Sequence, residues 1–331
     1  MASQTPFSPN PSQRARLRYF SSNKIPTYLF RIVAPESGGS ASMSTVISEA
    51  LMSPDCSNPP DDIFNHSPTK AAALIKAHLM WQCNKQSNFM SWTSSLLFAL
   101  QFGLYRYETD YDNPDFSEIF LYILDTSGFP EGTFIKDLDI LDAFKEESLD
   151  LQRFLKLRRG NFKKRYYFGE YLTQGRLEIE GNCARVSLQQ MMDLGLFELH
   201  PGLENKNRWI SLANRVLELR TNFKYLPSTT HSEIQKTIKI AQCCFGDRWV
   251  VPFAAMLLAL RPRSHQDHDK IAEAYWEMFT AEEIMIQDIQ IDPEGLPEVR
   301  QFGQIINAVK RKFNNSDIDE LQNPFSRLGL E

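Results

Sequence analysis

Short runs of apolar and β-branched residues predict strands in the first half of the chain. Tyr28–Val33 combines aromatic and β-branched side chains, Ile119–Leu124 is apolar throughout, and Tyr166–Gly175 is rich in β-formers. Runs of this kind, bounded by turn residues, are typical of half-buried or fully buried strands. We expect an additional edge strand within Phe134–Leu141 and continued pairing over Arg176–Glu180.

Helical periodicity surrounds these strands. Ser67 and Pro68 form an N-cap and first-turn pair for a helix ending near Trp81, while Ser94–Tyr105 and Leu141–Leu157 carry apolar residues at helical spacing. Together these elements predict an α+β domain over residues 25–184, in which short strands form a split sheet. The preceding residues 1–24 are rich in Ser, Pro and Asn, which favours a disordered tail.

From Ser187 onwards the pattern is helix after helix. We therefore expect an all-helical region over residues 185–331, without a repeat of fixed period. Its predicted helices are Ser187–Leu194, Trp209–Leu219, His231–Cys244, Trp249–Leu260, His268–Phe279 and Val299–Phe313, with Thr280–Glu283 as the capping-box start of another.

Composition and charge narrow the class of protein. The chain has 331 residues, so it can bury a substantial core, and its net charge of −5 argues against a general nucleic-acid coat. Five scattered cysteines indicate neither a disulfide framework nor a zinc site. The N-terminus lacks the apolar segment of a secretory signal, and the longest apolar run, Trp249–Leu260, is too short to cross a bilayer. We expect an intracellular protein, cytoplasmic or nuclear, with no membrane contact.

Three stretches carry candidate chemistry. Glu170 opens a strand after a basic loop and three aromatic residues, a setting that could keep a carboxylate charged while excluding water. Arg31 lies in the middle of the first strand, where burial is costly unless an anion or a carboxylate pairs with it. Ser91 begins a hydroxyl cluster, Ser91-Trp92-Thr93-Ser94-Ser95, directly before an apolar helix. The alternative is structural: a half-buried strand whose Glu170 pairs with a neighbouring arginine.

The order of these residues resembles the Arg-Ser-Glu class of mono-ADP-ribosyltransferases, the toxin-like branch of that superfamily. In that class an arginine on the first strand is followed by a Ser-Thr-Ser type motif and by a Glu-φ-φ-x-x-Gly stretch, where φ is an apolar residue. Here the corresponding residues are Arg31, Ser91 and Glu170, the last followed by Tyr-Leu-Thr-Gln-Gly. The chain departs from the pattern at Trp92, where Thr is usual, and at Phe168, where Glu or Gln is usual, which puts arginine as the acceptor in doubt.

The resemblance implies a split-sheet ADP-ribosyltransferase-like fold and a glycosyltransferase that uses NAD as substrate, without a metal. Arg31 would hold the pyrophosphate or ribose side of NAD, Ser91 would bind the nicotinamide ribose, and Glu170 would stabilise the cationic transition state. Nicotinamide would leave and ADP-ribose would pass to an unknown protein or nucleic-acid acceptor. The remaining implied contacts with NAD are Ile32 and Thr93. Tyr166, Tyr167 or Phe168 could meet the acceptor or stack on nicotinamide, and packing is favoured for at least two of these three.

Alternatives to transfer remain open at this point. The same site could hydrolyse NAD with water as acceptor, or the chain could be a non-catalytic interaction protein with a degenerate transferase fold. The cations from Lys163 to Arg165 could attract an acidic acceptor or form a solvated loop face. His78 could act as a catalytic base, although the sequence favours a surface or core-edge histidine without an identifiable partner. Asp110, Asp112 and Asp115 lack the pattern of a calcium loop and indicate a solvated loop.

Overall fold

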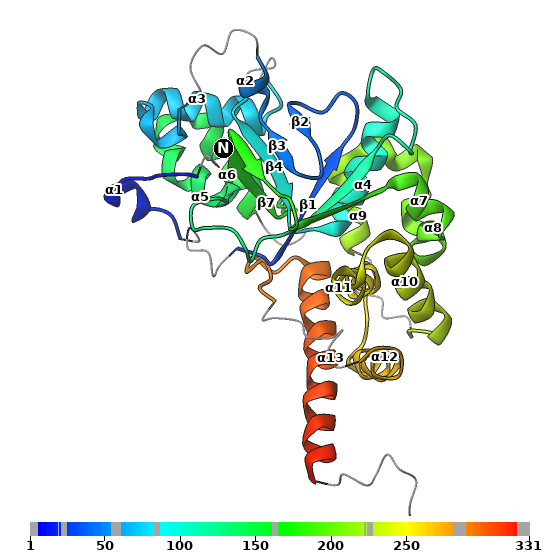
Figure 1. Cartoon of the computed structure of the whole chain (residues 1–331). Coiled ribbons are helices and arrows are strands. Elements are labelled where there is room, and N and C mark those ends of the chain that lie inside the picture. Colours follow the sequence, from blue (N-terminus) through cyan, green and yellow to red (C-terminus); the bar gives the residue numbers. More distant parts are fainter. Residues whose placement is uncertain are drawn as a thin grey trace, which may run out of the picture.

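A six-stranded antiparallel sheet, in the order β6-β7-β4-β1-β5-β9, organises the N-terminal half of the chain (Figure 1). Its strands are β1 (Tyr28–Val33), β4 (Phe89–Thr93), β5 (Phe120–Asp125), β6 (Ile135–Lys136), β7 (Glu170–Gln174) and β9 (Cys183–Ser187). The computed structural model describes residues 6–18, 20, 25–53, 61–82, 87–160, 165–221, 223, 228–280 and 289–322. The prediction of strands mixed with helices, followed by a helical C-terminal region, is confirmed.

The sheet opens between its two central strands. β1 pairs with β5 along its whole length, from Tyr28 opposite Asp125 to Val33 opposite Phe120. Its ladder with β4 consists of one pair, Phe30 opposite Thr93. Because adjacent strands stay close only where their ladder continues, β1 and β4 separate beyond this pair.

A second sheet of three strands covers one face of the first. It consists of β2 (Ser40–Ala41), β3 (Thr45–Ile47) and β8 (Arg176–Glu178). Val46 and Leu177 pack with Leu29 and Trp92 in one hydrophobic cluster. The pairing predicted over Arg176–Glu180 occurs at Arg176–Glu178, but in the other sheet: Gly175, at φ 65°, turns the chain so that β8 pairs with β3.

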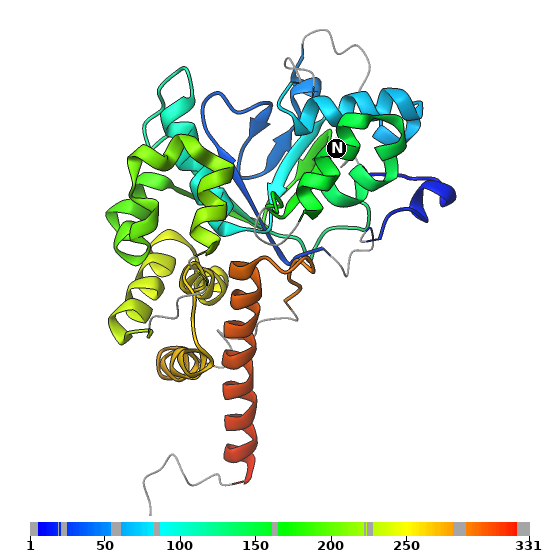
Figure 2. The ribbon, with the colours of Figure 1, turned by 180° about the vertical axis from the view of Figure 1, so that it is seen from behind.

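Helices cover the opposite face of the six-stranded sheet in two groups (Figures 1 and 2). The first group, α3 (Pro68–Leu79), α5 (Asp137–Phe144) and α6 (Leu149–Arg159), packs on β4 and β7, and Ser67 caps α3 as predicted. The second group begins with α4 (Leu96–Thr109), whose leucines pack on Phe30 and Ile32 of β1. The opening between β1 and β4 therefore lies between two groups of helices.

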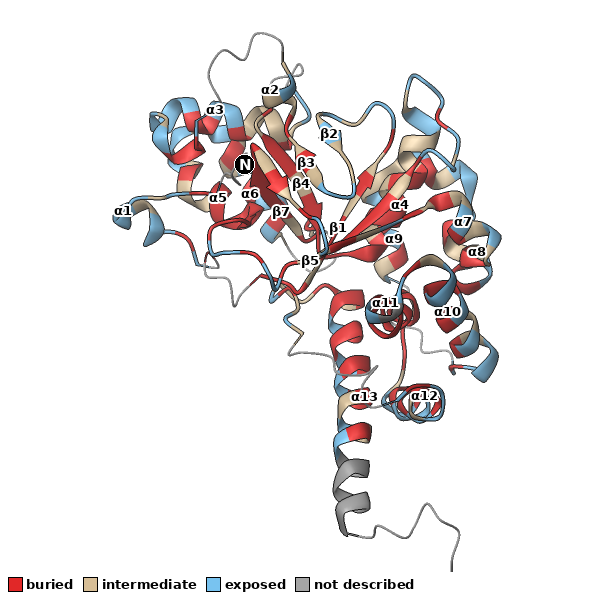
Figure 3. Cartoon of the chain, viewed as in Figure 1, coloured by how far each residue is buried: buried red, intermediate tan, exposed pale blue. Residues whose placement is uncertain are grey.

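The C-terminal region is helical and shares a hydrophobic core with the sheet. Its α-helices are α7 (Leu188–Asp193), α8 (Leu196–Leu199), α9 (Leu212–Thr221), α10 (His231–Cys244), α11 (Asp247–Ala259), α12 (His265–Met278) and α13 (Pro297–Gln322). One cluster of buried residues runs from Phe30 through α4 and α11 to Phe313. Buried residues accordingly gather along the strands and on the turns of α13 nearest the sheet (Figure 3).

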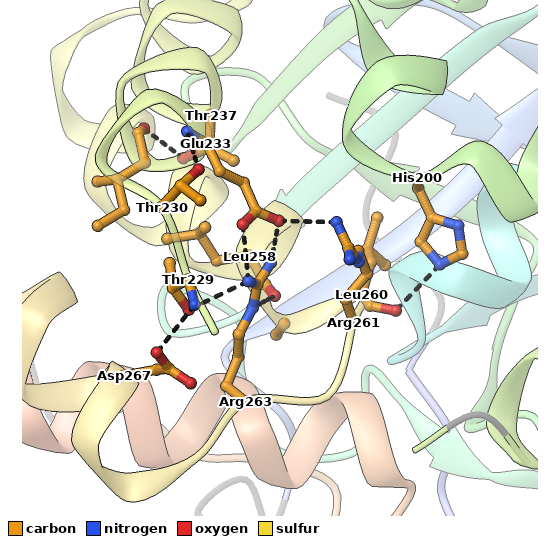
Figure 4. Close-up of polar contacts among 12 residues, drawn as sticks. His200, Thr229, Thr230, Glu233, Thr237, Leu258, Leu260, Arg261, Arg263 and Asp267 are labelled. Atoms are coloured by element: carbon orange, nitrogen blue, oxygen red, sulfur yellow. Dashed lines mark hydrogen bonds and ion pairs between the residues drawn. The ribbon is translucent and has the colours of Figure 1, made fainter. Parts of the chain in front are cut away.

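Polar contacts fasten the helices of this region to one another (Figure 4). Arg263, between α11 and α12, forms a bidentate ion pair with Glu233 of α10, at 2.9 Å for Nη1–Oε2 and 2.5 Å for Nη2–Oε1. The backbone N–H of Thr229 donates to Asp267 of α12 at 2.8 Å. The Arg263 side chain is 1% exposed, and a buried cation needs a partner of opposite charge. The ion pair with Glu233 therefore has a structural role.

The edge strand or strand-loop predicted within Phe134–Leu141 occurs as the short β6, and α5 follows it directly from Asp137. Two other predictions need correction. The tail is ordered where the structure describes it: Phe7 is 3% exposed and packs on Phe64 and Phe89. The strand β9 was not predicted, and it crosses the expected boundary at residue 184. The capping-box start at Thr280–Glu283 lies largely outside the described residues.

The remaining short elements are α1 (Pro11–Arg14), α2 (Glu49–Met52) and four 3₁₀ turns within the described residues, Ile63–Asn65, Lys145–Glu147, Pro201–Leu203 and Lys206–Ser211. Among the helices that the structure describes, none combines the length and apolar character needed to cross a membrane.

Candidate active site

The structure brings together the three residues that the sequence predicts as catalytic. Arg31 lies on β1, Ser91 on β4 and Glu170 on β7, which are consecutive strands of the sheet. The Ser91 hydroxyl donates to Glu170 Oε1 at 2.8 Å, and Arg31 Nη1 donates to the Ser91 carbonyl oxygen at 2.8 Å. All three line a cleft of about 520 Å³ at the opening between β1 and β4.

Arg31 reaches this cleft from the other face of the sheet. Residues alternate along β1, so Arg31 lies on the face opposite to Phe30, and its guanidinium carbon is 6.0 Å from the Trp92 ring. Burial, followed by the charge of nearby Arg106, lowers the pKa of Arg31 to about 10. Its Nε is buried without a hydrogen-bond partner among the described residues. Arg31 is therefore still a cation at neutral pH.

The Glu170 carboxylate is the end of a buried series of ion pairs in which Arg158 contacts both Glu170 and Asp137. Arg158 Nη2 donates to Glu170 Oε2 at 2.6 Å, and Arg158 Nε lies 3.2 Å from Asp137 Oδ2. Burial raises the pKa of Asp137, and the nearby Glu170 adds to the rise, while Arg158 opposes it. The pairing with a neighbouring arginine is what the structural alternative expected. It also fixes one oxygen of Glu170 and leaves the other directed towards Ser91.

His78 belongs to this site, so the prediction of a histidine without a partner is wrong. Its Nε2 lies 2.8 Å from Ser91 Oγ and its Nδ1 lies 2.7 Å from Ser87 Oγ. Burial, followed by the charge of Arg31, lowers the pKa of His78 to about 3. The available signal in the sequence was position: His78 follows the buried stripe of α3 near its end, shortly before the strand that carries Ser91.

Aromatic side chains form one wall of the cleft. Phe98, Phe102 and Tyr105 follow one another along α4, and adjacent rings are nearly parallel, with interplanar angles of 6° and 17°. Trp81, which is 63% exposed, packs against Phe102 and Tyr105 with ring centroids at 5.7 and 6.1 Å. Its backbone has φ 55°, a left-handed conformation that is unusual for a bulky residue. This wall can accept a flat ring by stacking.

The other predicted contacts with NAD have mixed outcomes. Ile32 lines the cleft, although its side chain is 5% exposed and packs in the core. Thr93 also lines the cleft, but its hydroxyl donates to the Phe168 carbonyl oxygen at 2.6 Å. Thr93 therefore fixes the chain just before Glu170, and its hydroxyl is already engaged.

The predicted acceptor residues do not line the cleft. Tyr167 is 0% exposed and donates to Asp292, and Phe168 is stacked on Phe98 with centroids at 4.7 Å. Both are packing residues, the alternative favoured for at least two of the three aromatic residues. Tyr166 is half-buried and donates to Asn214 at 3.0 Å. In the basic loop, Lys163 and Lys164 lie outside the described residues, whereas Arg165 pairs with Glu294.

A buried carboxylate from the helical region braces the strand of Glu170. Asp292 accepts from the hydroxyls of Tyr167 and Tyr171 at 2.7 and 3.0 Å. Lys136 of β6, which is 0% exposed, lies 3.3 Å from the same carboxylate. The segment before α13 is thus bonded to β6 and β7, so the C-terminal region helps to fix the position of the strand that carries Glu170.

The charge of the cleft is mixed. Arg31 and Arg106 are the cations among its described lining residues, and Arg106 already pairs with Asp110 at 2.5 Å. At the rim, carboxylate oxygens of Glu36, Asp110 and Asp112 lie within 4.8 Å of one another, a grouping that could hold a metal ion. Exposed acidic groups of this kind also occur without an ion, so the expectation of a metal-free site stays a prediction.

The fold and site define a mixed α/β protein with an arginine, a serine and a glutamate gathered at a split in its sheet. The chain belongs to the family described as Domain of unknown function (DUF7587), whose model matches residues 24–189. The matched segment contains Arg31, His78, Ser91 and Glu170 and ends at the start of α7. Comparisons with curated proteins and with solved structures returned no match.

Proposed function

We propose that this protein is an NAD-dependent mono-ADP-ribosyltransferase whose site is formed by Arg31, Ser91 and Glu170. The observation that carries the proposal is the bond of 2.8 Å between the Ser91 hydroxyl and Glu170, beside an arginine that spans the split between β1 and β4. The sequence motifs alone are short. Their convergence from three separate strands on one cleft is the independent support.

The proposed reaction breaks the bond between nicotinamide and the ribose C1′ carbon, and its electron pair leaves with nicotinamide. The positive charge that develops on the ribose is stabilised by the carboxylate of Glu170, which Arg158 and Ser91 hold in place. Arg31, a cation that lines the cleft, is placed to bind the pyrophosphate. The acceptor then forms a bond to C1′ and gives up a proton.

Water is the second candidate acceptor, and Phe168 favours it. Two residues before Glu170, this side chain is 6% exposed and stacked on Phe98, so it offers no polar group to orient a nucleophile. Hydrolysis by the same site would release free ADP-ribose. The choice between transfer and hydrolysis therefore depends on where the ADP-ribose is found.

The test is incubation of the whole chain with NAD labelled in the adenine ring, following both nicotinamide and the label. We expect nicotinamide release that Glu170→Gln abolishes, with the label on protein or nucleic acid for transfer and in free ADP-ribose for hydrolysis. Glu178→Gln is the matched control, because Glu178 lies on β8, does not line the cleft and pairs with Arg176. Absence of release together with absence of NAD binding by calorimetry would refute both activities and favour a non-catalytic interaction protein.

A further inference from the structure

A chain of hydrogen bonds leads from α3 to the carboxylate of the site. Ser87 Oγ lies 2.7 Å from His78 Nδ1, His78 Nε2 lies 2.8 Å from Ser91 Oγ, and Ser91 Oγ lies 2.8 Å from Glu170 Oε1. The chain therefore connects a helix that contributes no group to the proposed chemistry with the two residues, Ser91 and Glu170, that do. Nothing in the Arg-Ser-Glu motifs calls for a histidine at this place.

The protons in this chain can be ordered. An ionised carboxylate only accepts, so the single proton of the Ser91 hydroxyl points to Glu170. Ser91 Oγ must then accept from His78, which places the ring proton on Nε2. The Nδ1 atom of a neutral ring is an acceptor, and the hydroxyl of Ser87 supplies its donor.

A neutral imidazole is the form that this order requires, and the surroundings favour it. Burial, followed by the charge of Arg31, lowers the pKa of His78 to about 3. The charged residues that line the same cleft are Arg31 from β1, Glu170 from β7, Glu49 from α2, Glu36, and Arg106 with Asp110 at the end of α4. Among these, Arg31 is the charge that acts on the pKa of His78. Glu170 is already paired with Arg158 and bonded to Ser91, so it does not need a cationic ring.

We propose that His78 is a positioning residue: its Nε2–H holds the Ser91 hydroxyl in the rotamer that points to Glu170. This inference rests on the proposed function, since Ser91 and Glu170 are the groups that meet NAD. His78 acts through Ser91 and has no contact with Glu170 of its own. Losing the donor at Nε2 frees Ser91 to rotate, and misplacement of a reacting group by about 1 Å can cost roughly 100-fold in rate.

A double-mutant cycle separates this role from packing, because the His78 ring also contacts the Phe89 ring at a centroid distance of 5.3 Å. His78→Phe keeps a ring and removes the donor, and we expect it to lower kcat and kcat/KM together by roughly 10- to 100-fold. In a Ser91→Ala background the same change should have less than about a twofold effect, because Ser91 is the group through which His78 acts. An equal further loss in that background would overturn the proposal.

Two more variants complete the kinetic test. His78→Gln extends an N–H donor to about the position of Nε2, so it should recover most of the rate that His78→Phe loses. His231→Asn is the matched control, since His231 is exposed on α10 and its ring bonds to Gln235. A His78→Gln variant as slow as His78→Phe would contradict a role as donor.

Nuclear magnetic resonance of the histidine ring nitrogens tests the proton order without any activity. We expect the ring of His78 to be neutral and protonated at Nε2 from about pH 8 to about pH 5, and its Nε2 signal to shift in Ser91→Ala. A ring protonated at Nδ1, or one that titrates near its ordinary pKa, would overturn the inference. If the parent protein does not cleave NAD but this signal is as expected, the proposed function fails while the contact of His78 with Ser91 stands.

Discussion

The neutral His78 makes the stability of the fold depend on pH in a calculable way. In the unfolded chain a histidine has its ordinary pKa of 6.5, whereas burial and Arg31 lower the pKa of His78 in the fold to about 3. Between these values the unfolded state binds a proton that the folded state does not. The free energy of unfolding therefore has its full value, as far as His78 is concerned, above pH 6.5. It falls as the pH decreases from 6.5 towards about 3.

The size of this loss follows from the two pKa values. At about pH 7 the unfolded histidine is mostly neutral and the penalty is a few tenths of a kcal/mol. At about pH 5 the unfolded histidine is protonated and the folded one is not, which lowers the free energy of unfolding by about 2 kcal/mol relative to pH 7. Other groups, including His200, whose pKa burial lowers to about 4, contribute in the same direction.

The contribution of His78 is isolated by comparison with His78→Phe, which cannot titrate. Urea unfolding of both proteins at about pH 7 and about pH 5 should show a decrease that is larger by about 2 kcal/mol in the parent, because all other groups cancel in the difference. His231→Asn is the control for loss of a histidine and should behave as the parent does, since His231 is exposed on α10 and bonds only to Gln235 among the described residues. Equal decreases in the parent and in His78→Phe would mean that the folded ring becomes protonated, and the proton order at Ser91 would be refuted.

Other parts of the account lead to further measurements. Arg158→Met leaves Asp137 and Glu170 without their shared cation, so we expect a loss of about 3–5 kcal/mol in urea unfolding; a change below about 1 kcal/mol would contradict the importance of this ion-pair chain. Asp292→Ala removes the acceptor of two tyrosine hydroxyls and should cost at least about 3 kcal/mol, with Asp292→Asn, which keeps an acceptor, costing less. Trp81→Ala, at an exposed position, should change stability by less than about 0.5 kcal/mol yet weaken NAD binding about 3- to 10-fold through lost stacking, and unchanged binding in calorimetry would remove the aromatic wall from the site.

Elements with strong local signals were predictable from the sequence. The strand Tyr28–Val33 and the helix His231–Cys244 occur with the predicted bounds, because the first is a run of aromatic and β-branched residues and the second has apolar residues at helical spacing. The gathering of Arg31, Ser91 and Glu170 was accessible through motif order. Their adjacency in the sheet is what the structure adds.

The missed features depend on contacts between distant segments. His78 has no neighbour in sequence that marks it, and its role follows from the way α3 lies over Ser91. Asp292 accepts a hydrogen bond from the hydroxyl of Tyr171, which lies 121 positions earlier in the chain. No local sequence pattern could relate two residues so far apart. For Tyr167 and Phe168 the sequence left both an acceptor contact and packing open, because large aromatic side chains serve either purpose. Their burial against Asp292 and Phe98 is decided by tertiary packing.

The rate of nicotinamide release from NAD, measured for the parent chain and for Glu170→Gln under identical conditions, tests the central claim most directly. The account predicts release by the parent and a decrease of at least about 100-fold in the variant, the scale expected when a group that stabilises transition-state charge is removed. Both proteins should unfold at similar urea concentrations, because glutamine keeps an acceptor for Arg158. Equal rates in the two proteins, or no release by a folded parent chain, would contradict the claim that Glu170 is the catalytic carboxylate of an NAD-cleaving site.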